Sequence, residues 1–225
     1  MFKHIAAFEL RYQLRGPVFW VAAALFFLLA FGATTSEHIQ IGARGNVHVN
    51  APFAILQTLG IFGVFGIFAV TAFVAGAVIR DDETGFAPLL RATRLGKPAY
   101  VLGRFVGATG VAYLVMCASA LGLWIGSWMP WIDSDKIGPQ LAWHYLWALG
   151  LFVLPTLLVT AAAFFALAIA TRSLMWTYVG AVGGLVLFTV ARLLARGDPA
   201  LDTFVALSDP FGVSASPRMA ANQPE

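Results

Sequence analysis

The stretch from Ala51 to Ile79 contains no charged side chain and ends abruptly at Arg80. At about 1.5 Å of rise per residue, a helix over this stretch is long enough to cross the roughly 30 Å hydrocarbon core of a bilayer with tilt to spare. The whole chain is 60% hydrophobic and only 11% charged, whereas an ordinary soluble domain has about 25% charged residues. The sequence therefore excludes a water-soluble globule and predicts an integral membrane protein.

Four other apolar stretches are also long enough to span. The run from Tyr145 to Val190 is too long for one helix, and it divides naturally at Arg172. The expected spans cover residues 18–34, 51–79, 105–128, 145–170 and 174–191. Residues 1–17 are expected to form an amphipathic interfacial helix, and residues 192–225 a polar tail. The predicted fold class is all-α, a polytopic integral membrane helical bundle of about five transmembrane helices with an N-terminal interfacial helix.

The first span has an alternative interpretation as a secretory signal peptide. The segment before it is long for a signal peptide and carries Glu9, and the small residues Ala30 and Gly32 give only a weak cleavage site. The sequence therefore favours a retained membrane span.

The distribution of basic residues predicts the orientation in the membrane. Of the 14 Lys and Arg residues, most precede the first span or lie in the connections between spans two and three and between spans four and five. Cytoplasmic loops are enriched in Lys and Arg. We therefore expect a cytoplasmic N-terminus and an extracytoplasmic tail.

No motif in the chain predicts catalysis. The predicted spans lack Asp, Glu and Lys, which disfavours an ion-coupled carrier. The four histidines do not form an H-E-x-x-H pair, and the single cysteine excludes a multi-cysteine metal site. Gly96 and Lys97 are followed by Pro98, so no phosphate-binding loop is present. We expect no enzymatic activity, no catalytic residues, no cofactor, no metal site and no nucleic-acid partner.

Residues 1–15 have the pattern of a helix that rests on membrane lipid. The pattern places Ile5, Phe8 and Tyr12 on one side and His4, Arg11 and Arg15 on a neighbouring side. Such a helix buries its apolar stripe in lipid while its cations meet anionic headgroups. It is interpreted either as a lever that transmits motion or as a simple anchor.

Small residues recur at helical spacing in three predicted spans. The pairs are Gly103 with Gly107, Gly122 with Gly126 and Gly180 with Gly184, and the second span carries Gly60, Gly63 and Gly66. Glycine lets helix backbones approach closely in lipid. Packing within the chain is favoured over a dimer seam, and Pro155 predicts a kink in span four.

The expected loop 80–104 is the most distinctive segment. Phe86, Leu89 and Leu90 would form an apolar knob on a short helix, between acidic residues before it and basic residues after it. This pattern suits a groove on a cytoplasmic protein. A connector that skims the lipid surface is the alternative.

The motifs of this loop resemble a known family. Glu83-Thr-Gly, then Leu89-Leu-Arg-Ala-Thr, then Gly96-Lys-Pro-Ala-Tyr-Val-Leu-Gly-Arg104 are similar to the first cytoplasmic loop of ABC-2 type permeases. The segments Phe8–Arg15 and Ala170–Ser173 extend the resemblance over residues 1 to about 212. Within the family, the chain is most similar to the N-terminal membrane region of bacterial permeases fused to an M1-type aminopeptidase-like domain.

The resemblance implies a permease subunit in the inner (plasma) membrane of a bacterium. It would pair with a second permease half, as a homodimer or heterodimer, and with ATP-binding ABC subunits that hydrolyse the ATP. The residues that would contact the ATPase are Glu83, Thr84, Gly85, Phe86, Leu89, Leu90, Arg91 and Arg94.

The chain departs from the family pattern near its end. The family has six spans per permease half, whereas the apolar pattern here stops after five and continues as a polar tail. We expect a truncated or frameshifted reading frame. A membrane anchor or assembly factor of a larger complex, without transport, is the alternative function, and the substrate and the direction of transport cannot be read from the spans.

Overall fold

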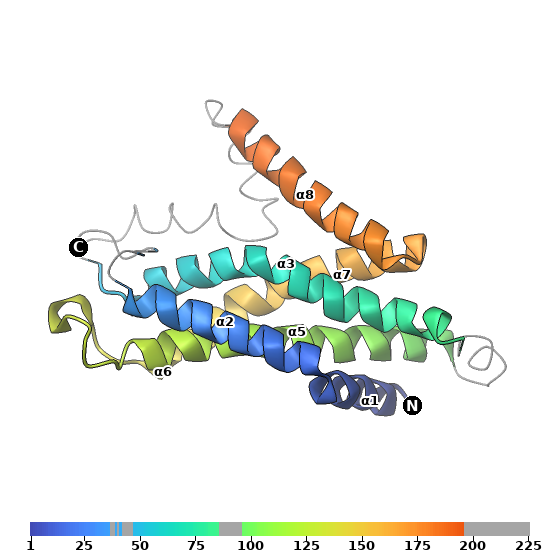
Figure 1. The fold of residues 1–225 in the computed structure, drawn as a ribbon, viewed down its shortest axis with the longest axis horizontal. Coiled ribbons are helices and arrows are strands. Elements are labelled where there is room, and N and C mark those ends of the chain that lie inside the picture. Colours follow the sequence, from blue (N-terminus) through green and yellow to red (C-terminus); the bar gives the residue numbers. More distant parts are fainter. Residues whose placement is uncertain (37–38, 40, 42–46, 86–95, 196–225) are drawn as a thin grey trace.

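A computed structural model shows an all-α bundle and describes residues 1–36, 39, 41, 47–85 and 96–195. Its elements in chain order are α1 (Phe2–Arg15), α2 (Pro17–Thr35), α3 (Pro52–Glu83), α5 (Lys97–Gly126), the 3-10 turn η1 (Ser134–Lys136), α6 (Ala142–Trp147), the π-helical segment η2 (Ala148–Val153), α7 (Leu154–Thr171) and α8 (Leu174–Ala195). Figure 1 shows α2, α3, α5 and α7 side by side, with α1 at one end and the η1 turn at the other. We call these two ends of the bundle the α1 end and the η1 end.

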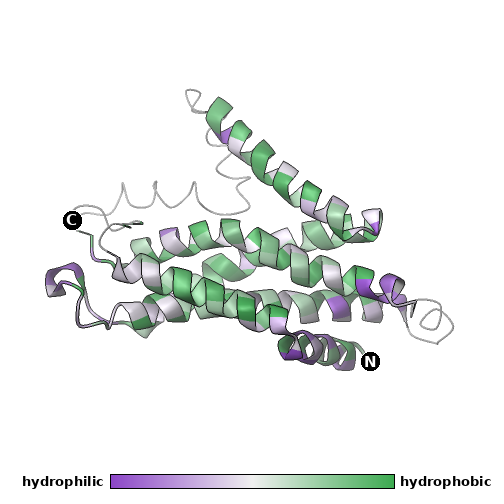
Figure 2. Cartoon of the chain, in the orientation of Figure 1, coloured by the Kyte–Doolittle hydropathy of each residue, from purple (hydrophilic) through white to green (hydrophobic). Residues whose placement is uncertain are grey.

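Five helical segments are long and apolar enough to cross a membrane within the described part of the chain. They cover residues 17–35, 52–81, 97–126, 142–171 and 174–194. Hydrophilic residues gather around α1, at the end of α3 and around η1, and the helices between them are mainly hydrophobic (Figure 2). This arrangement confirms the predicted fold class, a polytopic helical membrane bundle.

The loop expected over residues 80–104 is much shorter than predicted. Helix α3 continues to Glu83, and helix α5 begins at Lys97 rather than near residue 105. The prediction was wrong because it ended each span at the first charge, whereas a helix can continue into the polar headgroup region beyond the hydrocarbon core. Arg80, Asp81 and Arg104 are therefore helical residues.

Local sequence explains where these two helices stop and start. Gly85 has a φ of +69°, a left-handed conformation that suits glycine and ends α3. The Thr84 hydroxyl donates to the Arg80 carbonyl at 2.8 Å, so one carbonyl of the last turn gains a second partner. At the start of α5, Pro98 lies in the first turn, where its missing N–H is not needed.

Helix α5 is the centre of the bundle and packs against α1, α2, α3 and α7. Its glycine pairs make two of these contacts close. A Cβ at Gly107 would lie 2.7 Å from the Ala6 carbonyl oxygen of α1, and a Cβ at Gly122 would lie 2.4 Å from the Phe27 carbonyl oxygen of α2. These glycines therefore pack helices of the same chain, as the sequence favoured.

The glycines of α3 behave differently. A Cβ at Gly63 would meet nothing within 4 Å. Gly60, Gly63 and Gly66 instead border a small cavity of about 20 Å³, which is also lined by Met116 of α5 and Thr156 of α7. The glycine-rich stretch of α3 is thus not a close packing seam among the described residues.

The fourth span is not a uniform α-helix. The π-helical segment Ala148–Val153 directly precedes α7, whose second residue is Pro155. A proline inside a helix removes one i→i−4 hydrogen bond and crowds the carbonyl four residues earlier. A wider π turn accommodates this crowding, so the irregularity lies where Pro155 predicts a kink.

Helix α8 leans away from the other helices (Figure 1). It contacts α3 and α7, with Ala181 of α8 buried beside Ile67 of α3. Only 11% of its most apolar window is buried within the chain. Most of its apolar surface is therefore left to lipid or to another protein.

The close α2–α5 contact predicts different effects for two glycine substitutions. Gly122→Ala places a methyl group against the Phe27 carbonyl, so we expect it to lower the free energy of unfolding by about 1–3 kcal/mol, as overpacking does. Gly63→Ala is the matched control, because its methyl group enters open space. Thermal unfolding of both purified variants in mild detergent checks this, and equal midpoints would contradict the close contact.

Candidate functional site

Four charged side chains from three helices meet at the α1 end of the bundle. They are Glu9 of α1, Arg80 and Asp81 of α3, and Arg104 of α5, and we call them the charge cluster. Glu9 is 0% exposed, and Asp81 and Arg104 are also buried. Two carboxylates and two guanidinium groups make the cluster neutral as a whole.

Glu9 is the hub of the charge cluster. One of its carboxylate oxygens accepts from Arg80 Nη2 and from Arg104 Nη1, each at 2.6 Å. The other accepts from Gln13 Nε2 at 2.6 Å, and the same amide nitrogen reaches the Phe73 carbonyl of α3 at 3.1 Å. A single α1 side chain is therefore bonded to both α3 and α5.

Asp81 and the aromatic residues complete the arrangement. Arg104 Nη2 lies 2.5 Å from both carboxylate oxygens of Asp81, and the Tyr100 hydroxyl donates to the same carboxylate. The guanidinium of Arg80 lies 4.1 Å from the centre of the Tyr12 ring, a cation–π distance. Each charged group is thus satisfied by at least one partner of opposite charge.

Glycines in α5 allow Glu9 to reach its partners. A Cβ at Gly103 would lie 2.8 Å from the Ile5 Cβ, and a Cβ at Gly107 would lie 2.7 Å from the Glu9 Cβ. Because neither glycine has a side chain, α1 lies directly against the α5 backbone on both sides of Arg104. The small-residue spacing and the buried charges are therefore parts of one contact.

The coupling residues predicted from the sequence lie next to the charge cluster only in part. Glu83 is the exposed last residue of α3, and Thr84 and Gly85 form the turn that follows it. Phe86, Leu89, Leu90, Arg91 and Arg94 lie outside the described residues. Glu83 is less than one helical turn from Arg80 and Asp81, so the start of the predicted contact region is joined directly to the cluster.

Sequence reasoning missed the charge cluster. The charges at 80, 81 and 104 were assigned to the expected loop 80–104, and Ile5 was placed on the lipid side of α1, whereas it packs against Gly103. One available signal was Glu9, which is the only acidic residue among the first 36. Its presence inside an otherwise basic segment indicates that it has a partner elsewhere.

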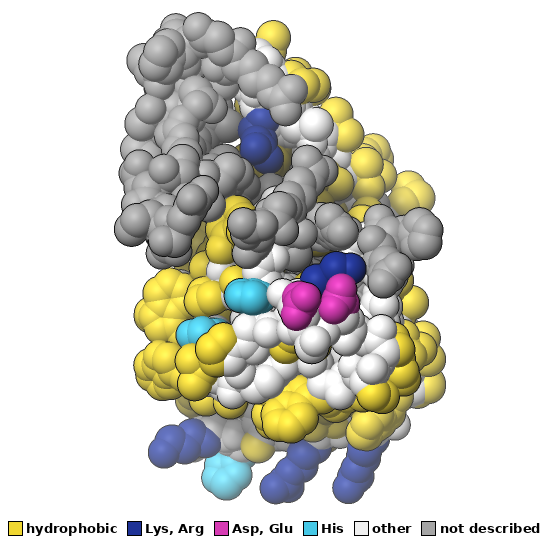
Figure 3. All heavy atoms as spheres, turned by 90° about the vertical axis from the view of Figure 1, so that its left-hand side faces the viewer, with side chains coloured by type: hydrophobic (Ala, Val, Ile, Leu, Met, Phe, Trp, Pro, Cys, Tyr) yellow, Lys and Arg dark blue, Asp and Glu magenta, His cyan; other side chains and the backbone are white. Residues whose placement is uncertain are grey.

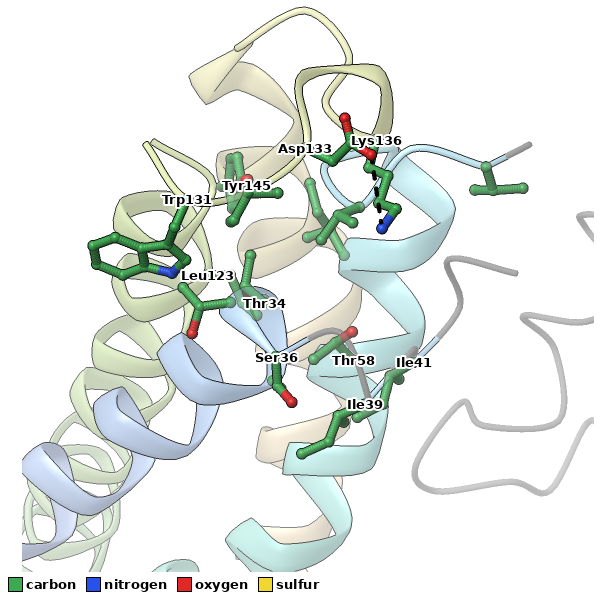
Figure 4. A pocket seen from close by; sticks show the side chains of 16 residues that line it. Thr34, Ser36, Ile39, Ile41, Thr58, Leu123, Trp131, Asp133, Lys136 and Tyr145 are labelled. Carbon is green, nitrogen blue, oxygen red and sulfur yellow. Dashed lines mark ion pairs between the residues drawn. The ribbon is translucent and has the colours of Figure 1, made fainter. Parts of the chain in front are cut away.

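The η1 end has a separate feature, a cavity of about 100 Å³. Thr34 and Thr58 line it, and Tyr145 and the ion pair of Asp133 with Lys136 also border it (Figure 4). Both threonine hydroxyls donate to carbonyls of their own helices.

The connections that frame this cavity are bonded to one another. The Asn50 side chain accepts from the Gly138 N–H at 2.7 Å and donates to the Gly138 carbonyl at 2.8 Å.

Metal binding has no candidate in the described part of the chain, where no three His, Cys, Asp or Glu residues form a ligand group.

The charge cluster leaves no charge free to bind a ligand, since its acids and bases neutralise one another. Such an arrangement holds α1, α3 and α5 together. No known protein-family model matches the sequence, and no curated protein is significantly similar to it.

The hub position of Glu9 predicts a large effect of its neutralisation. Glu9→Gln leaves Arg104 buried with one carboxylate partner fewer, and removing one partner of a buried ion pair typically costs 3–5 kcal/mol. We expect a loss in unfolding free energy near the lower limit, about 3 kcal/mol, because the Arg80 side chain is 21% exposed and keeps some contact with water.

Thermal unfolding in detergent measures this effect. The matched control is Glu83→Gln, which makes the same chemical change at an exposed position. If both variants unfold at the wild-type temperature, Glu9 is not the hub.

Proposed function

We propose that the protein is the permease subunit of an ABC-2 type transporter. In this proposal a separate ATP-binding subunit hydrolyses ATP, and the helical bundle described above moves a substrate across the inner membrane of a bacterium. A second permease half, identical or different, completes the pathway. The chain itself carries out no chemical step.

The charge cluster is the observation that supports this proposal most. It bonds α1 to the last turn of α3 and to the N-terminal part of α5. These two helices flank residues 86–95, the centre of the region that resembles the ATPase-contact loop. A force applied at that loop would therefore move α3, α5 and α1 together rather than one helix alone.

The sequence of the same region supports the assignment of the partner. Glu83, Thr84 and Gly85 begin the motif, and the residues proposed to follow them in the contact are Phe86, Leu89, Leu90, Arg91 and Arg94. Among the described residues, Arg80 of α3 and Lys97 and Arg104 of α5 lie at the same end of the bundle as Arg11 and Arg15 of α1, which favours a cytoplasmic location for this end.

Recovery of an ATPase with the protein tests the proposal. We expect the tagged chain, purified from its native host in mild detergent, to bring an ATPase with it. Glu83→Lys and Leu89→Asp are each expected to abolish this recovery, because they reverse a charge or place one on the apolar face of the contact.

Asp133→Lys is the matched control, since it makes the same type of change at the η1 end, where Asp133 is exposed. An ATPase retained equally by Glu83→Lys and by the control would refute the assigned contact. If wild type brings no ATPase, a membrane anchor or assembly factor becomes the better interpretation.

The orientation is tested independently of the partner. Alkaline phosphatase is active only after export, so we expect a fusion after Asp135 to be active and a fusion after Glu83 to be inactive. The two sites lie at opposite ends of the bundle (Figure 1). The reverse pattern would place α1 outside the cytoplasm and would exclude a cytoplasmic ATPase contact at Glu83.

A further inference from the structure

The outer face of α1 forms a shallow hollow that is open to its surroundings, and its lining residues all belong to α1 or directly follow it. It is lined by Phe8 and Tyr12 and by the basic side chains of His4, Arg11 and Arg15. Phe8 and Tyr12 are 60% and 51% exposed, although both are aromatic. In the view of Figure 3, Lys, Arg and His side chains gather at the lower edge of the molecule, where α1 lies in Figure 1.

The positive charge of this face is not compensated within the described residues. Glu9, the one acidic residue of α1, points to the opposite side and is bonded there to Arg80, Arg104 and Gln13. Arg11 and Arg15 are exposed and form no ion pair among the residues that the structure describes. Because Glu9 is paired inside the charge cluster, it does not balance Arg11 and Arg15 on the outer face. The hollow therefore favours an anionic ligand.

The level of the hollow in the membrane indicates where that ligand comes from. Helix α2, the first span, starts at Pro17, directly after α1. Trp20, which is 65% exposed, donates from its indole Nε1 to the Leu14 carbonyl at 3.0 Å. Exposed tryptophans concentrate at the level of the lipid headgroups. The hollow therefore faces the headgroup layer, with Phe8 and Tyr12 as its apolar surface.

We propose that this hollow binds the headgroup of an anionic phospholipid from the adjacent leaflet. Arg11 and Arg15 contact the phosphate, and Phe8 and Tyr12 contact the glycerol and the first acyl carbons. The proposal does not depend on transport or on an ATPase partner.

The lipid site adjoins the charge cluster through one ring. Tyr12 lines the hollow, and the guanidinium of Arg80 lies 4.1 Å from the centre of its ring. A bound lipid is therefore separated from the cluster by a single side chain.

Native mass spectrometry of the full chain in neutral detergent tests the proposal, with dioleoyl phosphatidylglycerol as the anionic probe and dioleoyl phosphatidylcholine as the neutral one. We expect tighter binding of phosphatidylglycerol by wild type. Arg11→Gln with Arg15→Gln is expected to weaken it roughly thirtyfold, since each cation near an anionic surface contributes about fivefold in affinity. Arg11→Lys with Arg15→Lys is expected to restore binding because it restores the charge.

Lys97→Gln with Arg172→Gln is the matched control. Both residues are exposed at the same end of the bundle, and neither lines the hollow. Their substitution by Gln removes the same amount of positive charge as the Arg11 and Arg15 double variant. We expect the control to bind phosphatidylglycerol like wild type, and all variants to unfold at the wild-type temperature because their side chains are exposed.

Three outcomes would overturn the lipid site. One is unchanged binding by the Arg11 and Arg15 double variant. Another is equal weakening by that variant and the control, which would show diffuse attraction rather than a site. The third is displacement of the lipid by millimolar inorganic phosphate, which would assign the hollow to a soluble anion.

Discussion

A carboxylate with no exposed surface cannot stay charged at the end of a membrane bundle unless cations are brought to it. Glu9 meets this requirement with two arginines from two different helices. Because losing a partner would leave a buried charge unpaired, the three helices are held in one arrangement. The close approach of α1 to α5 at Gly103 and Gly107 places Glu9 beside these arginines, and because Glu9 is paired there, the cations on the outer face of α1 have no acid beside them among the described residues.

The spans themselves could be predicted from composition alone. Long uncharged runs between charged residues give the number and order of membrane helices, because the bilayer imposes a minimum length on each. Their ends could not be predicted in this way. Arg80 and Arg104 read as loop charges in the sequence, but each has a carboxylate partner that allows it to be helical and partly or fully buried.

The charge cluster could not be found from spacing because its members are far apart in the chain. The contacts of Glu9 join residues 71 and 95 positions away. Helical periodicity reports only which residues share one face of one helix. The glycine pairs gave a partial signal, since Gly103 and Gly107 mark the place on α5 where another helix can approach, but they do not say which helix it is.

Helix α8 is joined to α7 by a short turn in which Arg172 has a φ of +49°, and only a small part of its surface is covered. Helix α8 emerges during synthesis after α1, α2, α3, α5 and α7, so it meets a bundle whose central helix α5 already has its main partners. Its loss would expose little that is now buried, so the first four spans should form a folding unit of their own. Among the five described helices that are long enough to span, α8 is the least buried within the chain, so moving it would break the fewest contacts.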